Sequence, residues 1–359
     1  MSYVLAFAGF ALLIILHEAG HFTAAKAVGM RVERFALFFP PLLFKVRRGE
    51  TEYGIGAIPL GGYVRISGMN PYEEIPEEHA HRAYFRQPVW KRIVVIAAGP
   101  FVNVVIGIVI FAGIFAFHGT FETTNTVAKG GLKPPALGAL QAGDKILAVD
   151  GRRGGFQSVQ DEIQHHRCAT VPPRAGCVAA TPARLLIERG GNQRTLLLHP
   201  RYNASAKKML IGFTFDGHIV KQSVGGALSL AVTRSWQIGR DTVKAIARIF
   251  YSSKARKDVS GVVGSYEVTQ QSFGFDTTQA LLVLGIISLS LAVVNLFPFL
   301  PLDGGHIFWA LAEKIRGKPI PFSVIERASA VGFVLVIMLF VIGLSNDIGR
   351  LRGEGFGVR

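Results

Sequence analysis

The chain has 359 residues, of which 50% are hydrophobic and only 18% are charged, and its mean hydropathy is +0.36. This composition excludes an ordinary soluble domain of the same size and favours a membrane protein. The net charge of +15 does not indicate nucleic-acid binding, because the basic residues are scattered and no aromatic-interleaved basic motif accompanies them.

Four apolar runs are long enough, at about 20 residues, to cross the ~30 Å hydrocarbon core of a bilayer. They are Tyr3–Ala25, Ile93–Phe117, Ala280–Leu302 and the shorter Ala328–Leu344. The first lacks the basic segment that begins a secretory signal peptide, so we interpret it as a membrane span rather than a cleaved leader.

Basic residues are in excess between the first two predicted spans and in the loop after Leu302. The positive-inside rule therefore places both loops in the cytosol. Both termini and the long segment from His118 to Gln279 would then be extracytoplasmic.

Between the first two spans, Glu52–Met69 combines β-favouring residues with glycines at 54, 56, 61 and 62, which predicts a glycine-bent hairpin or small sheet at Tyr53–Ser67. In the second span, Pro100 and Asn103 predict a locally adjusted helix that packs against protein on that side.

The outer segment begins with a predicted strand at Lys145–Val149, an Asp150–Gly151 turn and a helical pattern from Ser158. A hairpin is predicted at residues 183–200. This order is similar to that of a bacterial, circularly permuted PDZ domain, over residues 121–202.

An insert in this PDZ-like segment contains both cysteines of the chain. An oxidising compartment permits Cys168 and Cys177 to pair, and we expect their disulfide to close the insert. After it, residues 221–257 carry the irregular helical spacing of amphipathic helices that lie at the outer membrane surface.

In the first span, His17 and His21 are four residues apart, so on a helix their rings lie on one face at the spacing that binds a metal ion. Glu18 lies beside the pair and can act as a general base without being a ligand. The histidines could instead make interhelical hydrogen bonds. However, the adjacent glutamate adds an insertion cost of a few kcal/mol that packing does not explain.

Catalytic zinc usually has three protein ligands and a water, so a third ligand must come from another span. Asp303 is the acid at a comparable depth, and it follows a predicted helix break at Pro298 and Pro301. It could instead cap the next helix, and His306 could be the third ligand in its place. The pattern favours a Zn²⁺ site of two histidines and one carboxylate.

The pairing of HEAGH in the first span with NLFPFLPLDGG in the third resembles the site-2 protease family of intramembrane zinc metalloproteases. The glycine-bent hairpin, GPFVN in the second span, the PDZ-like segment and SNDIGRL after the fourth span are similar to the branch of bacterial regulator-of-sigma-E proteases. The resemblance covers nearly the whole chain. It departs in having one PDZ-like domain where the best-known members of the branch have two.

The resemblance implies that His17, His21 and Asp303 bind Zn²⁺ and that Glu18 is the general base. Six other residues are expected to contact the substrate or to shape the helix break around it. They are Asn295, Pro298, Pro301, Gly54, Gly56 and Asn103. For Asn295, an interhelical hydrogen bond is the alternative.

The expected fold is a polytopic α-helical membrane protein with four transmembrane helices, a glycine-rich membrane-associated β-hairpin and an extracytoplasmic α/β PDZ-like domain. The expected units are two halves of a membrane core, the PDZ-like domain and an extracytoplasmic linker of amphipathic helices. The two halves of the core are residues 1–117 and 280–359. The PDZ-like domain is residues 121–202, and the linker is residues 203–279.

By this resemblance we expect an endopeptidase of the bacterial cytoplasmic membrane, with its active site toward the cytosol. Its expected substrates are single-span membrane proteins in the lipid bilayer. They would be a stress-response anti-sigma factor already shortened on its outer side, in regulated intramembrane proteolysis, and remnant signal peptides. A non-catalytic PDZ scaffold and a transporter are the alternatives, but the intact HEAGH with Asp303 forms a hydrolase set.

Overall fold

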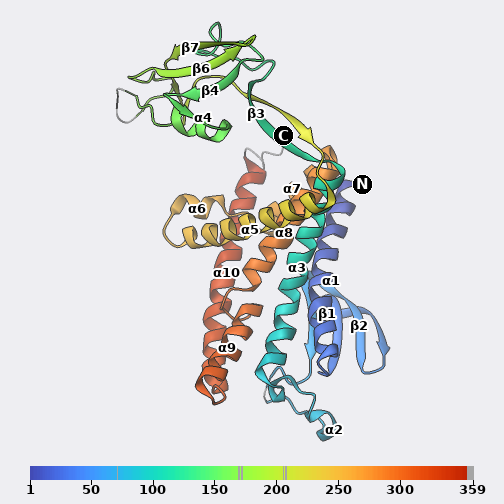
Figure 1. The fold of residues 1–359 in the computed structure, drawn as a ribbon. Coiled ribbons are helices and arrows are strands. Elements are labelled where there is room, and N and C mark those ends of the chain that lie inside the picture. Colours follow the sequence, from blue (N-terminus) through green and yellow to red (C-terminus); the bar gives the residue numbers. More distant parts are fainter. Residues whose placement is uncertain (71, 169, 171–172, 205, 207, 354–359) are drawn as a thin grey trace. The chain divides into compact units, whose positions relative to one another are not determined.

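The structure, a computed structural model, describes residues 1–70, 72–168, 170, 173–204, 206 and 208–353 (Figure 1). The chain folds into two compact units. The first, here the membrane unit, is Met1–Ala116 together with Ser223–Arg359. The second, here the inserted unit, is Phe117–Gln222.

In the described part of the chain, four helices of the membrane unit are long and apolar enough to cross a membrane. Each contains most or all of one predicted apolar run, which confirms the four candidate spans. The second of them continues through Pro100 without ending. The helices are α1 (Ser2–Ala27), α3 (Val89–Phe117), α8 (Thr277–Asn295) and α10 (Phe322–Arg352).

The third span is shorter than predicted. α8 follows its N-cap Asp276, whose carboxylate accepts a hydrogen bond from the backbone of Thr278 at 3.0 Å, and it ends at Asn295 rather than Leu302. Prolines at 298 and 301 explain the early end, because proline has no N–H and disfavours helical geometry in the residue before it. After this break of residues 296–302, the chain begins α9 (Asp303–Arg316).

Between α1 and α3, β1 (Val32–Arg48) and β2 (Thr51–Ile66) form an antiparallel sheet. Both strands bend, so four segments lie side by side in the order 42–48, 51–56, 32–37 and 62–66. The prediction of a hairpin confined to residues 53–67 is therefore wrong in its pairing, because the first half of β1 lies between the two halves of β2. The turn between the strands lies at Gly49, whose φ of 59° suits glycine.

Three helices, α5, α6 and α7, lie between the inserted unit and α8 in the described chain. α5 (Val224–Ile249) places Ala231 against Phe111 of α3 and Leu289 of α8. α2 (Glu77–Ala80), the short helix η1 (Tyr84–Arg86), α6 (Ser253–Asp258) and α7 (Val262–Phe275) complete the unit's helices in the described residues.

The end of α10 is joined to the start of α7 by a fully buried carboxylate. Asp347 accepts hydrogen bonds from the backbone amides of Gly261 at 3.1 Å and Gly264 at 2.7 Å. It satisfies amides that a helix start leaves without partners. The SNDIGRL motif therefore has a structural role here, which ties the last span to α7.

The inserted unit is built on a six-stranded sheet of order β10-β3-β4-β6-β7, with β5 paired to β4, among the described residues. Its core includes Ile146, Val149, Val159, Leu185 and Ile187. The elements of the unit are β3 (Thr120–Val127), β4 (Lys145–Val149), β5 (Arg152–Arg153), α4 (Phe156–Ile163), β6 (Ala183–Arg189), β7 (Asn192–Leu198), β8 (Arg201–Asn203), β9 (Lys208–Leu210) and β10 (Phe215–Val220).

The predicted strand, turn, helix and hairpin of this unit are all present as β4, the Asp150–Gly151 turn, α4 and β6–β7. The start of the predicted helical linker differs from the prediction, since Lys208–Leu210 and Phe215–Val220 form strands β9 and β10 of this unit. Glycines at 212 and 217 disfavour a helix there, and β10 instead pairs with β3.

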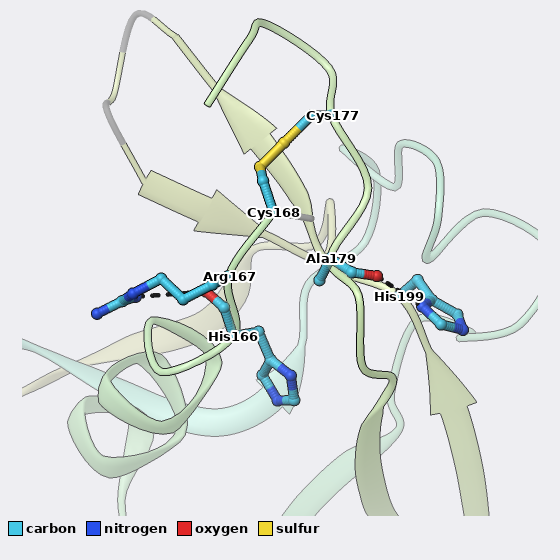
Figure 2. The surroundings of a disulfide bond; sticks show 6 residues. All are labelled: His166, Arg167, Cys168, Cys177, Ala179 and His199. Carbon is cyan, nitrogen blue, oxygen red and sulfur yellow. Dashed lines mark hydrogen bonds between the residues drawn. A yellow bond between two sulfur atoms is a disulfide. The ribbon is translucent and has the colours of Figure 1, made fainter. Parts of the chain in front are cut away.

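Cys168 and Cys177 form a disulfide, as predicted (Figure 2). The loop that it closes includes residues 169 and 171–172, which lie outside the described residues. Beside it, His199 donates a hydrogen bond from Nδ1 to the carbonyl of Ala179 at 3.0 Å. The disulfide thus closes the insert, which lies between α4 and β6.

Candidate metal centre

The two histidines of HEAGH lie on one face of α1, as their spacing predicts. His17 and His21 are each 7% exposed, and their Nε2 atoms are 3.3 Å apart. His21 donates a hydrogen bond from Nδ1 to the carbonyl of Val95 at 2.9 Å. Because Nδ1 carries the hydrogen, the lone pair of Nε2 is free to bind a metal.

Asp303, the first residue of α9, brings a carboxylate to this pair from the far end of the sequence. Its Oδ2 lies 3.3 Å from Nε2 of His17 and 3.4 Å from Nε2 of His21. In the described residues, these three side chains are the one group of His, Cys, Asp or Glu that could together hold a metal ion.

The three atoms have the separations that a tetrahedral zinc site requires. Ligand atoms ~2.0–2.1 Å from a tetrahedral zinc lie about 3.3–3.4 Å from one another. Oδ2 of Asp303 is also buried and has no hydrogen bond among the described residues, which is the state expected of an atom whose partner is a metal. The donor set of two imidazoles and one carboxylate therefore fits Zn²⁺.

Glycines at two helix crossings let these ligands meet. A Cβ atom at Gly99 of α3 would lie 2.3 Å from Nε2 of His21. At the start of α9, Cβ atoms at Gly304 and Gly305 would lie 2.2 Å and 2.5 Å from backbone atoms of the helix break. The first turn of α9 can therefore pack directly on the break, and this contact positions Asp303.

The sequence left two alternatives at α9: Asp303 could cap the helix, and His306 could be the third metal ligand. No side chain caps the N-terminus of α9, and Oδ2 of Asp303 faces the histidines instead. His306 is outside the group of three possible ligands. Farther along, Glu313 accepts two hydrogen bonds from Arg92 of α3, at 2.6 and 3.0 Å, which fixes the end of the helix.

Glu18 lies between the histidine pair and the sheet. A Cβ atom at Gly62 would lie 2.7 Å from Cγ of Glu18, so β2 passes directly against this side chain. The sequence predicted a glycine-rich sheet, but no role was predicted for Gly62. The position of Gly62 inside a strand could have predicted the close approach of another element, because glycine has no side chain to prevent it.

The residues predicted to contact substrate fall into three places. Asn295, at the end of α8, has its amide nitrogen 3.4 Å from Nε2 of His17, and Pro298 and Pro301 are exposed in the break that follows. Gly54 and Gly56 are in the segment 51–56, which pairs with 42–48 along its length and with 34–37 over residues 52–55.

Asn103 is fully buried on α3, with its amide nitrogen 3.1 Å from Nδ1 of His17. This position favours contact with the histidine over contact with a substrate. Val95, Gly99 and Asn103 lie about one turn apart on one face of α3, so this face contacts both histidines. Asn103 was predicted from the sequence as a site residue, whereas Val95 and Gly99 were not. The four-residue spacing of the three would have placed them on one helix face.

Comparison with known proteins agrees with this site. The chain matches peptidase family M50 over residues 5–339. A Clostridium perfringens protein named as a candidate zinc metalloprotease is 31% identical over 352 residues, which cover 97% of this chain and 98% of that protein. A Campylobacter jejuni protein with a similar name is 28% identical over 355 residues, which cover 95% of this chain and 92% of that protein. Zinc metalloprotease Rip1 of Mycobacterium tuberculosis is 28% identical over 396 residues, covering 97% of this chain and 98% of Rip1.

Proposed function

Since the chain belongs to peptidase family M50, the site-2 protease family of zinc metalloproteases, we propose that it cleaves peptide bonds inside the membrane-spanning segments of single-span proteins. Family membership confirms the predicted metalloprotease class and zinc cofactor. The observation that carries the proposal is the placement of the three ligands on a membrane span and beside a helix break, with Glu18 next to them.

His17, His21 and Asp303 would hold the zinc ion. Zinc, when bound, supplies a Lewis acid that polarises the scissile carbonyl and acidifies a water. Glu18 would take the proton from the attacking water and pass it to the leaving amine, which makes it the general base and then the general acid. Its position outside the ligand group leaves its carboxylate available for this proton transfer.

A helical substrate must be locally unwound, because its carbonyls are engaged in its own hydrogen bonds. The segment 62–66 of β2 is a free edge in the described part of the sheet, and an unwound substrate can add to it as a further strand. A cleft of about 440 Å³ runs along Tyr63, Val64, Arg65 and Ile66. Gly62 brings this edge close to Glu18, so a strand bound here would pass near the catalytic group.

Other predicted substrate residues would act around this strand. Asn295 would replace hydrogen bonds that the substrate backbone loses on unwinding, and Pro298 and Pro301 keep the chain open beside it. Gly54, which pairs with Ala36 on one side and Lys45 on the other, and Gly56, which pairs with Leu42, would act indirectly by letting the sheet bend. Their Cβ atoms would lie 2.9 Å from Leu42 and 2.1 Å from the carbonyl of Phe39, respectively.

The protein would lie in the bacterial cytoplasmic membrane with its termini and its PDZ-like inserted unit outside. His17 lies beyond the middle of α1, so the site would be nearer the cytosolic face. The proposed substrates are an anti-sigma factor already shortened on its outer side and remnant signal peptides. The basic loops between the spans support this orientation.

The deciding experiment is cleavage of candidate single-span substrates in vesicles by wild type and Glu18→Gln. The substitution should abolish turnover and retain zinc, because it removes the base and no ligand. Glu78→Gln is the matched control, since the Glu78 side chain is 75% exposed and lies outside the site. Substrate binding without cleavage by the wild type would favour the PDZ scaffold instead.

A second experiment concerns the inserted unit, which we propose excludes substrates with bulky outer domains. The replacement must remove residues 117–222, because β9 and β10 belong to the unit. With a flexible linker in their place, cleavage of a full-length substrate should rise relative to that of a shortened one. An unchanged ratio in a folded variant would rule out size selection.

A further inference from the structure

Asn103 presents an unusual contact to the metal centre. Its side chain is fully buried, and its amide nitrogen Nδ2 lies 3.1 Å from Nδ1 of His17. Its amide oxygen Oδ1 is also buried and has no hydrogen-bond partner among the described residues. A nitrogen that only donates therefore faces the imidazole, while the oxygen that can accept has no partner.

The ligand geometry determines which nitrogen of His17 carries a hydrogen. Nε2 of His17 is the atom that faces Asp303 and His21, so its lone pair must be free for the metal. A neutral imidazole with a free Nε2 has its hydrogen on Nδ1. Nδ1–H of His17 needs an acceptor, and the side-chain amide of Asn103 is the group beside it.

We propose that Asn103 is a positioning residue whose amide oxygen accepts the hydrogen bond from Nδ1–H of His17. A half-turn of the amide group exchanges Oδ1 and Nδ2, which occupy nearly the same space and are distinguished only by their partners. Either orientation leaves one end of the amide without a partner among the described residues. Only the orientation with Oδ1 toward His17 gives Nδ1–H an acceptor.

The same helix already does this for the other histidine. The carbonyl of Val95 accepts from Nδ1 of His21 at 2.9 Å, and Gly99 leaves room for the rings between Val95 and Asn103. Ser288 of α8 donates to the backbone carbonyl of Asn103 at 2.9 Å, which anchors this part of α3. One face of α3 thus orients both imidazoles, by a backbone carbonyl in one case and a side-chain amide in the other.

The test is zinc affinity, measured by competition with a chelator on the full chain in detergent or vesicles. Asn103→Leu keeps the approximate shape and removes the acceptor, so affinity should fall about 10- to 100-fold, the usual loss for an outer hydrogen-bond partner of a ligand. Asn103→Asp keeps an acceptor in either orientation, so affinity should stay within a few-fold of the wild type.

A purely structural role would give a different pattern. In that case the zinc-free leucine variant would unfold more readily, and the aspartate variant would not rescue zinc binding. Thermal unfolding of the zinc-free proteins measures this separately. Wild-type zinc affinity in Asn103→Leu, or equal losses in both variants, would overturn the proposal.

The inference rests on the zinc site of the proposed function and not on the identity of its substrate. If the wild type binds zinc and Asn103→Leu binds it equally well, this inference alone fails. If a zinc-loaded wild type cleaves no membrane substrate, the proposed function fails and the role of Asn103 stands. A substrate-binding role for Asn103 would raise KM and leave zinc affinity unchanged.

Discussion

Two carboxylates, Asp144 in the inserted unit and Asp303 in the membrane unit, show how the same group is used for two purposes. Asp144 is 1% exposed and accepts hydrogen bonds from Nε and Nη2 of Arg189, both at 2.7 Å, and from the backbone of Gln141 at 2.8 Å. Asp303 has a buried oxygen that faces two imidazoles and has no hydrogen bond in the described part of the chain. A saturated carboxylate stabilises a fold, whereas an unsaturated one is kept for a ligand.

The largest expected effect follows from removing the unsaturated carboxylate. Asp303→Ala should lower zinc affinity by more than about 100-fold, beyond the loss expected for an outer partner, and abolish cleavage. Metal content after purification and activity in vesicles measure the two losses. Full zinc content in the variant would show that Asp303 is not a ligand.

Removing the saturated carboxylate should affect stability and leave zinc binding intact. Asp144→Ala removes the carboxylate that accepts from Arg189, whose side chain is 23% exposed and keeps its hydrogen bond to the carbonyl of Ala139. It should destabilise the inserted unit by about 1.5–3 kcal/mol, the usual contribution of hydrogen bonds to a charged group. Denaturant unfolding of the full chain, followed by a probe in the inserted unit, measures the loss. Asp161→Ala, at an exposed position in the same unit, is the control and should change little.

A smaller effect is expected from crowding the ligands. Gly99→Ala would place a methyl group 2.3 Å from Nε2 of His21, so the ring must move and zinc affinity should fall about 10- to 100-fold. Gly113→Ala on the same helix is the control, because no atom lies within 4 Å of its added Cβ. Equal zinc affinity in the two variants would contradict the close approach of α3.

The smallest expected effect is on pH dependence. Burial alone would raise the pKa of Asp144, but hydrogen bonds from Arg189 and Gln141 outweigh it and hold the pKa below its usual value. A depressed folded-state pKa gives stability that is complete above the unfolded-state value of about 3.9 and is lost as pH falls through the folded-state value. Thermal unfolding between pH 7 and 3 should show this acid loss.

Asp144→Asn is the variant that isolates this contribution, because asparagine does not titrate. Its inserted unit should be less stable at pH 7 but lose less on acidification than the wild type. An acid loss of equal size in both proteins would assign the pH dependence to other groups.

Local elements of both regions could be predicted from the sequence because they depend on neighbours in the chain. The four-residue spacing of His17 and His21 puts them on one face of any helix, and an Asp150–Gly151 pair suits a tight turn. The pairing of β1 and β2 could not be predicted. Residues 35–44 resemble one apolar run with two prolines, and the order of the bent segments depends on contacts between residues far apart.

The sequence by itself determined the four apolar spans, the HEAGH face and, in the inserted unit, β4, the turn after it, α4 and the β6–β7 hairpin, since composition and short-range periodicity specify these. Only the tertiary structure decided that Asp303 meets the histidines at 3.3–3.4 Å, that 62–66, one edge of the sheet in the described residues, lies beside Glu18, and that Asn103 lies against His17. Each of these depends on how closely two helices or strands approach. That distance is set by residues on both partners, such as Gly99 of α3 and His21 of α1, and no single stretch of sequence contains both.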